Sequence, residues 1–285
     1  MKIKNVIFAD LDGTFLDDKY DFSEIKPIVN QLSALGSSVV FCSSKTRKEI
    51  EFYRKTVKIN EPFVSENGAA IFVPKSYFPF IYACAKAPQY NIIRLGVSYR
   101  KLREKLGEIK KKTAATIVGF GDMTLEELAT DTGLPSHLAT LAQKREHDEP
   151  FRIIQGNKSH VLKAIKHEGL RCTQGGRYYH LTGNNDKGKA VNILKNLYSQ
   201  MFGNVETFGI GDGPNDLPML KAVDKPFLIS QKSQGSSRFN AWTRILRSVA
   251  QSQACPKQTY NRIEPKTDLD CRAVNGLLQL FPRGS

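Results

Sequence analysis

A chain of 285 residues with 40% apolar and 25% charged side chains has the composition of a globular protein, and it is long enough for more than one domain. Its 42 Lys and Arg residues outnumber its 28 acidic residues, and the net charge of +14 favours an anionic partner, whether nucleic acid, anionic lipid or a small phosphorylated molecule. The five cysteines are odd in number and lack CxxC spacing, which argues against a disulfide framework and a zinc cage. Since no apolar run could span a membrane and no secretory signal precedes Asp10, we expect a cytoplasmic protein that does not act at a membrane.

Strands and helices alternate in the first third of the chain. Apolar, β-branched runs predict strands at 4–9 and 37–42, and a strand, a turn and a second strand within 62–74. Helical patterns at 22–36 and 46–57 lie between these strands. This order predicts a parallel sheet with helices on its faces.

A different pattern follows from about residue 83. Predicted strands lie at 91–96, 114–120, 151–156 and 170–182, and predicted helices at 98–112, 125–133, 136–146 and 157–169. The βα alternation then resumes with a long helix at 186–203, a strand at 204–212 and a helix from 214, followed by a basic helix around Trp242. We therefore predict a discontinuous α/β core (1–82 and 183–285, with an irregular tail at 252–285) interrupted by an inserted α+β domain at 83–182.

Two pairs of acids follow predicted strands. Asp10 and Asp12 come directly after the first strand, and Asp212 and Asp216 follow the strand at 204–212. Ligands bind at the carboxyl ends of strands in open α/β sheets, and carboxylates held close together need a cation or a shared proton. A turn at Asp12-Gly13 and helix caps at the second pair are the structural alternatives, but two such clusters together favour a magnesium site.

Phosphate chemistry requires further groups that meet the phosphoryl oxygens. Ser43 follows the second strand, and Lys187 opens the long helix, whose N-terminus itself favours anions. Taken alone, Ser43 could be an ordinary serine at a strand end and Lys187 a solvated lysine.

These four elements together resemble the motifs of the haloacid dehalogenase-like phosphatases. The motifs are DLDGT at 10–14, Ser43, Lys187 and GDGPND at 211–216. The resemblance implies a Rossmann-like three-layer α/β core with an inserted cap of the C2B type. It further implies Asp10 as the nucleophile, Asp12 as the general acid and base, and Ser43 and Lys187 as phosphate ligands. Mg²⁺ would be bound by Asp10, the Asp12 backbone carbonyl and Asp212, with Asn215 and Asp216 supporting the metal ligands.

Within that superfamily, several stretches resemble the mannosyl-3-phosphoglycerate phosphatases. They are SKTRKEIE, ENGAAIFVP, GFGDMTLEELATDTGL, REHDEPF and YYHLTGNNDKGKA. The implied reaction releases mannosylglycerate, a compatible solute, from a small phosphorylated sugar acid; glucosyl-3-phosphoglycerate or a general sugar phosphate is the alternative substrate. The residues implied in substrate binding are Lys45, Arg47, Glu66, Asn67, Gly68, Arg145 and His180.

DNA binding is the alternative from another functional class. Residues 125–146 read as a helix-turn-helix with Gly133 in the turn, and the chain is basic. The second helix, however, offers only Lys144 and Arg145 near its end, too few groups to read base edges. A non-catalytic anion-binding module is a further alternative, which the retention of both Asp10 and Asp12 disfavours.

Overall fold

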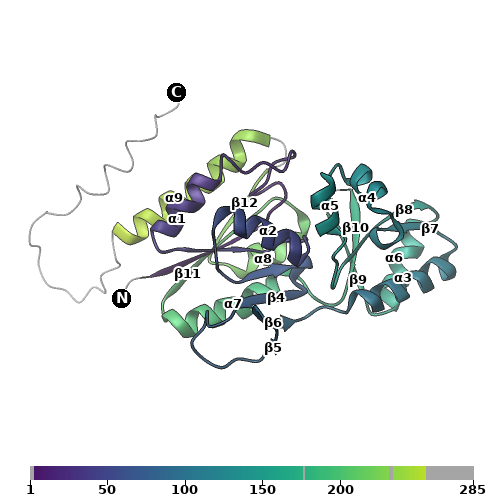
Figure 1. Ribbon diagram of the computed structural model, residues 1–285, viewed down its shortest axis with the longest axis horizontal. Coiled ribbons are helices and arrows are strands. Elements are labelled where there is room, and N and C mark those ends of the chain that lie inside the picture. The colour runs from purple at the N-terminus through teal and green to yellow at the C-terminus, as the bar shows by residue number, and fades with distance from the viewer. Residues whose placement is uncertain (1–2, 176, 231–233, 255–285) are drawn as a thin grey trace, which may run out of the picture.

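The computed structural model describes residues 3–175, 177–230 and 234–254 (Figure 1). Most of the predicted tail, including Cys255 and Cys271, lies outside these residues. The core contains a four-stranded parallel sheet in the order β12-β11-β1-β2. Its strands are β1 (Lys4–Ala9), β2 (Ser38–Phe41), β11 (Val205–Gly211) and β12 (Lys225–Leu228).

Helices cover both faces of this sheet, as Figure 1 shows for α1 and α9 on one side and α7 on the other. Alternation along β1 sends Ile7 toward the first layer and Val6 and Phe8 toward the second. The first layer contains α1 (Lys26–Ala34), α2 (Arg47–Val57) and α9 (Gln234–Ala254), and the second contains α7 (Lys187–Phe202) and α8 (Leu217–Ala222), preceded by the 3-10 turn η3 (Pro214–Asp216). The predicted three-layer α/β core is confirmed.

The predicted basic helix around Trp242 is part of this core. Trp242 is fully buried in α9, and its indole N–H donates to the carbonyl oxygen of Thr14 at 3.1 Å. The helix therefore supports the loop that follows β1 from behind.

A second core sheet has the order β3-β4-β6-β5. It contains β3 (Phe63–Ser65), β4 (Ala70–Pro74), β5 (Ala85–Lys86) and β6 (Tyr90–Arg94), with the 3-10 turn η1 (Glu66–Gly68) between β3 and β4. A parallel bridge between Cys42 and Val64 joins it to β2. The strand expected to begin the insertion thus pairs with β4 instead; the division of the chain at 82/83 stays a prediction.

The inserted unit contains an antiparallel sheet in the order β7-β8-β10-β9. Its strands are β7 (Thr116–Gly119), β8 (Glu149–Gln155), β9 (Arg171–Gly175) and β10 (Tyr178–Thr182). The helices α3 (Tyr99–Thr113) and α6 (Lys158–His167) share one apolar cluster with this sheet; α4 (Leu125–Thr132), α5 (Ser136–Ala142) and the 3-10 turn η2 (Phe120–Asp122) form another. Below, this unit is called the cap.

Within the described part of the chain, no helix combines the length and the apolarity needed to cross a membrane.

Candidate active site

Asp10 lies at the carboxyl end of β1, between β2 and β11. Its backbone N–H donates to the carbonyl oxygen of Ile210 at 3.0 Å, which fixes the position of the residue relative to β11. The side chain is buried, and its Oδ1 accepts a hydrogen bond from Lys187 Nζ at 2.7 Å. Burial and the carboxylate of Asp216 raise the pKa of Asp10 to about 8, although Lys187 opposes the shift.

Lys187 is fully buried at the first position of α7. The helix begins there because the Asp186 side chain caps it, accepting the backbone N–H of Lys189 at 2.8 Å. Lys187 Nζ donates to Asp10 and also to Asp216 Oδ1, at 2.6 Å. Burial alone would lower the pKa of Lys187, but these two carboxylates outweigh it and raise that pKa, so the ammonium stays charged. Its third N–H can still meet another oxygen.

A cluster of three carboxylates provides a candidate metal site. Oxygen atoms of Asp10, Asp212 and Asp216 lie within 4.8 Å of one another. Asp216 already has partners, because its Oδ1 contacts Lys187 and its Oδ2 accepts the backbone N–H groups of Asp212 and Gly213 at 3.0 and 2.9 Å. Three acids against one lysine leave an excess of negative charge, and such a set of oxygens fits a hard divalent cation. Asp10 and Asp212 are the side chains best placed to bind it, with Asp216 holding the loop that carries Asp212.

Asp12 faces a different partner. Its Oδ1 lies 2.9 Å from Lys45 Nζ, which also lies 3.5 Å from Glu49. Burial would lower the pKa of Lys45, but Asp12 and Glu49 outweigh that effect and raise it. Thr46 and Glu49 form a capping box that starts α2 and fixes this arrangement. The Asp12 side chain is 46% exposed and remains accessible to a ligand, unlike that of Asp10.

Two small residues complete the core side of the site. Gly13 has φ +68°, and a Cβ there would lie 2.4 Å from Asp212 Oδ2, so glycine allows the first acidic loop to approach the second. Ser43 is fully buried, and its Oγ accepts the backbone N–H of Lys45 at 3.2 Å, which leaves its own hydrogen available as a donor.

A cavity of about 330 Å³ separates this site from the cap. That size suits a small organic ligand. Asp12 and Lys45 from the core face Arg145, Arg177 and His180 from the cap across it. The cation-rich wall opposite a buried acidic centre suits a substrate with several negative charges.

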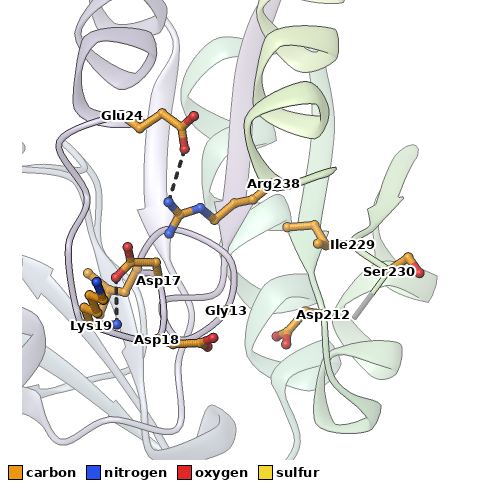
Figure 2. A pocket seen from close by; sticks show the side chains of 10 residues that line it. Gly13, Asp17, Asp18, Lys19, Glu24, Asp212, Ile229, Ser230 and Arg238 are labelled. Atoms are coloured by element: carbon orange, nitrogen blue, oxygen red, sulfur yellow. Dashed lines mark hydrogen bonds and ion pairs between the residues drawn. The ribbon is translucent and has the colours of Figure 1, made fainter. Parts of the chain in front are cut away.

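A second cavity of about 640 Å³ borders the site on its other side, where Asp212 and Gly13 line it as well. Figure 2 shows Arg238 reaching from α9 toward Glu24, at a distance of 3.3 Å, with Asp212 beyond the Gly13 loop. Acids, including Asp17 and Glu24, are prominent in its lining. The smaller cavity also has acids, but it adds Lys45, Arg145, Arg177 and His180 and includes Asp10, so it is the better candidate for binding a phosphate ester.

Several residues expected to bind substrate make contacts that join the core to the cap. Arg47 Nε donates to Glu146 at 2.7 Å. The Glu66 carboxylate accepts backbone N–H groups of Glu146 and His147, and Asn67 Nδ2 donates to an aspartate of the cap. Arg145 and His180 do line the cavity, so direct binding remains a hypothesis best supported for these two and for Lys45.

Gly68 packs directly against the start of α7. It has φ +85°, and a Cβ there would lie 2.1 Å from the Asp186 carbonyl oxygen. We expect Gly68→Ala to destabilise the protein by about 3 kcal/mol or more and to reduce activity, because it combines backbone strain with a clash beside Lys187. Urea unfolding and phosphate-release assays check both effects.

Gly36→Ala is the matched control. Gly36 has φ +75° but open space around its Cβ position, so its substitution should cost only about 1–2 kcal/mol, the strain alone. Equal losses of stability at the two positions would contradict the close-packing argument.

The predicted helix-turn-helix consists of α4, Gly133 at φ +74°, and α5. Leu138, Ala139 and Ala142 of α5 are buried, and Thr46 of the core donates to the Leu141 carbonyl oxygen at 3.0 Å. The second helix therefore packs against the core beside the candidate site, an arrangement that does not favour its insertion into a DNA groove.

Sequence reasoning missed several residues around the cavity. Arg177 and Tyr178 line it from the β9–β10 hairpin and Tyr20 from the loop after β1, and Glu49 holds Lys45. Glu49 and Tyr178 lie in SKTRKEIE and YYHLTGNNDKGKA, two stretches that carry the family resemblance, but no role was inferred for them. Tyr20 and Arg177 lie outside those stretches, and the aromatic and basic run GGRYYH is a signal that could have been followed for Arg177.

Comparison with known proteins supports the family resemblance that the motifs indicate. A sequence profile described as haloacid dehalogenase-like hydrolase matches residues 7–94. A protein of Methanococcoides burtonii named glucosyl-3-phosphoglycerate/mannosyl-3-phosphoglycerate phosphatase is 45% identical, with the match covering 82% of this chain and 87% of that protein. A mannosyl-3-phosphoglycerate phosphatase of Pyrococcus furiosus is 41% identical, over 79% of this chain and 90% of its own length.

Solved structures share the fold. A haloacid dehalogenase-like hydrolase from B. subtilis has a TM-score of 0.61 at 17% identity, covering 85% of this chain and 98% of its own. A sugar phosphatase of HAD subclass IIB has a TM-score of 0.55 at 12% identity, covering 86% and 99%. At such identities the likeness concerns the fold alone.

Proposed function

Because the chain belongs to the haloacid dehalogenase-like phosphatases, among the relatives of mannosyl-3-phosphoglycerate phosphatase, we propose that it hydrolyses mannosyl-3-phosphoglycerate to mannosylglycerate and phosphate. The observation that carries the proposal is the buried contact of Lys187 with Asp10 and Asp216, at the end of a cavity whose other wall bears Arg145 and His180. The named relatives supply the substrate class.

Glucosyl-3-phosphoglycerate is the second candidate substrate. The M. burtonii relative and one from Persephonella marina, each 45% identical to this chain, carry both substrate names. The two sugars differ in hydroxyl geometry only, so one cavity with adaptable polar contacts can accept both.

The reaction assigns different roles to the two acids of the DxD motif. Asp10 attacks phosphorus with its free carboxylate oxygen, forming an aspartyl-phosphate as the ester P–O bond breaks. Asp12 gives a proton to the departing sugar-acid oxygen, then takes one from the water that attacks the aspartyl-phosphate. That second step releases phosphate and restores Asp10. The pairing with Lys45 keeps Asp12 at the cavity wall, where the leaving oxygen arrives.

The charged groups around Asp10 support this chemistry. Lys187 holds Asp10 Oδ1, and its remaining N–H together with the Ser43 hydroxyl can bind phosphoryl oxygens. We propose Mg²⁺ as the divalent ion, bound by Asp10, Asp212 and the Asp12 backbone carbonyl. When bound, it supplies the positive charge that lets an anionic nucleophile meet an anionic ester. Asp216 and Asn215 position the loop that carries Asp212.

The proposed setting is the cytoplasm, with a soluble sugar acid as the partner. The described cysteines, Cys42, Cys84 and Cys172, are free thiols, consistent with a reducing compartment.

Phosphate release from a panel of esters tests the function. We expect mannosyl- and glucosyl-3-phosphoglycerate to be hydrolysed with at least about 100-fold higher kcat/KM than mannose 6-phosphate, since only the former carry the glycerate carboxylate for the cationic wall. EDTA should abolish turnover, and added Mg²⁺ should restore it. Equal rates for all esters would favour a general sugar phosphatase, and activity unaffected by EDTA would refute the metal site.

A further inference from the structure

Four consecutive cap residues, Arg145–Asp148, each contact the core. Arg145 Nη1 donates to the carbonyl oxygen of Ser44 at 2.8 Å. The backbone N–H groups of Glu146 and His147 donate to the Glu66 carboxylate. The side chain of Asp148 also contacts the core, where it accepts a hydrogen bond from Asn67. This segment therefore sets the position of the cap above the acidic centre.

Asp148 is the member of this segment that joins two candidate site residues. Its Oδ2 accepts a hydrogen bond from Asn67 Nδ2 of the core at 3.1 Å and lies 2.8 Å from His180 Nδ1 of the cap. Because Asn67 donates to this oxygen, Oδ2 acts as an acceptor, and we assign the imidazole proton to Nδ1. Nε2 of His180 is thereby left to meet a ligand, and His180 lines the cavity.

A stabilising role alone does not explain Asp148. The side chain is completely buried, yet its Oδ1 has no hydrogen-bond partner among the described residues, and Arg145 Nη1 is 3.9 Å from Oδ2. A buried carboxylate oxygen without a partner costs free energy. Such a cost points to a functional constraint on the residue.

The contacts continue to the acidic loop of the core. Asn215 Nδ2 donates to Asn67 Oδ1 at 3.1 Å, and Asn185 Nδ2 donates to the Asn67 carbonyl oxygen at 3.1 Å. Asn215 directly precedes Asp216. A continuous hydrogen-bonded chain thus runs from His180 through Asp148 and Asn67 to the loop that carries the acids.

We propose that Asp148 is a positioning residue that aims His180 at the sugar-acid portion of the substrate and fixes that aim relative to the phosphoryl-transfer site. This inference rests on the proposed function for the identity of the ester. Asp148 acts through His180, whose Nε2 binds the substrate, and through Asn67, which fixes the distance between cap and core.

The first test compares two esters. In Asp148→Ala, kcat/KM for mannosyl-3-phosphoglycerate should fall about 30- to 100-fold, the scale of a misplaced binding group. With 4-nitrophenyl phosphate, which has no sugar acid for His180 to bind, the loss should be about 10-fold smaller. Asp148→Asn keeps an acceptor for both N–H groups and should recover most of the activity. Equal losses with both esters, or no recovery in Asp148→Asn, would overturn the proposal.

The second test is a double-mutant cycle. If Asp148 acts through His180, adding Asp148→Ala to His180→Ala should lower kcat/KM by less than about 3-fold more. Losses that multiply would mean that the two residues act independently, which would contradict the proposal.

A third measurement does not depend on the substrate. Nitrogen-15 NMR of the protein with labelled histidine resolves the tautomers of its five histidines, and His180→Ala identifies the signal of interest. His180 should be protonated at Nδ1 in the wild type and in Asp148→Asn, and should lose this preference in Asp148→Ala. An unchanged tautomer would overturn the positioning role. A wild type that fails to hydrolyse either phosphoglycerate would instead refute the proposed function, while this NMR result would still decide the role of Asp148.

Discussion

Asp10→Asn should lower phosphate release by at least about 10⁴-fold, the scale found when a catalytic nucleophile is removed. The carboxamide has the size of the carboxylate and can still accept the hydrogen bond from Lys187, but it cannot attack phosphorus. The loss should therefore appear in kcat, with the fold intact. Steady-state assays and circular dichroism at matched concentrations provide the measurement.

The same substitution should not destabilise the protein. In EDTA, the unfolding midpoint of Asp10→Asn should equal or exceed that of the wild type, because the change removes one of three crowded carboxylates, two of which are buried. Asp12→Asn serves as the comparison: it keeps the nucleophile but loses the base that activates water in the second step, so its phosphorylated form should accumulate. Activity within about tenfold of the wild type in Asp10→Asn would refute covalent catalysis by this residue.

Lys187→Met is expected to be the most destabilising of the site substitutions. The lysine is fully buried between Asp10 and Asp216, so its removal leaves two buried acids without their cation. Removing one partner of a buried ion pair typically costs about 3–5 kcal/mol. Urea unfolding in EDTA should show a loss of this size, and turnover should fall as well.

Lys189→Met is the matched control on the same helix. Its side chain is 45% exposed, and its ammonium contacts Asn184 at the surface. Its substitution should change the free energy of unfolding by less than about 1 kcal/mol. If the two variants were equally stable, the buried cluster would not hold α7 in the way described.

The acidic centre could be predicted because each of its side chains follows a strand in sequence. Strand ends of a parallel sheet lie at one edge, so the order of elements along the chain is enough to bring together DLDGT and GDGPND. Lys187 begins α7, which follows a strand of the cap, and its place at the site was implied by the family resemblance. The three layers follow equally from the βα alternation. The acidic centre and the three layers could both be predicted because each depends on short sequence patterns that specify local structure.

The joint between core and cap could not be predicted, because it is formed by distant segments with no repeating pattern. Short apolar runs do not reveal their partners, and the strand at Tyr90–Arg94 pairs with β4 although its sequence suits either unit. The family resemblance implied that Arg47, Glu66 and Asn67 bind substrate. Only the folded arrangement shows that they contact the cap. Asp148 lies in REHDEPF, one of the stretches that carry the family resemblance, but that resemblance assigned no role to its side chain, because a single Asp in a sequence looks like any loop residue.

Mass spectrometry of the acid-quenched enzyme during turnover tests the central claim most directly. If Asp10 is the nucleophile, the peptide with residues 6–18 will carry one phosphoryl group on Asp10. The mass signal of this phosphorylated peptide will be stronger in Asp12→Asn. Turnover of mannosyl-3-phosphoglycerate with no phosphorylated protein in either enzyme, or with the group on another residue, would contradict the account.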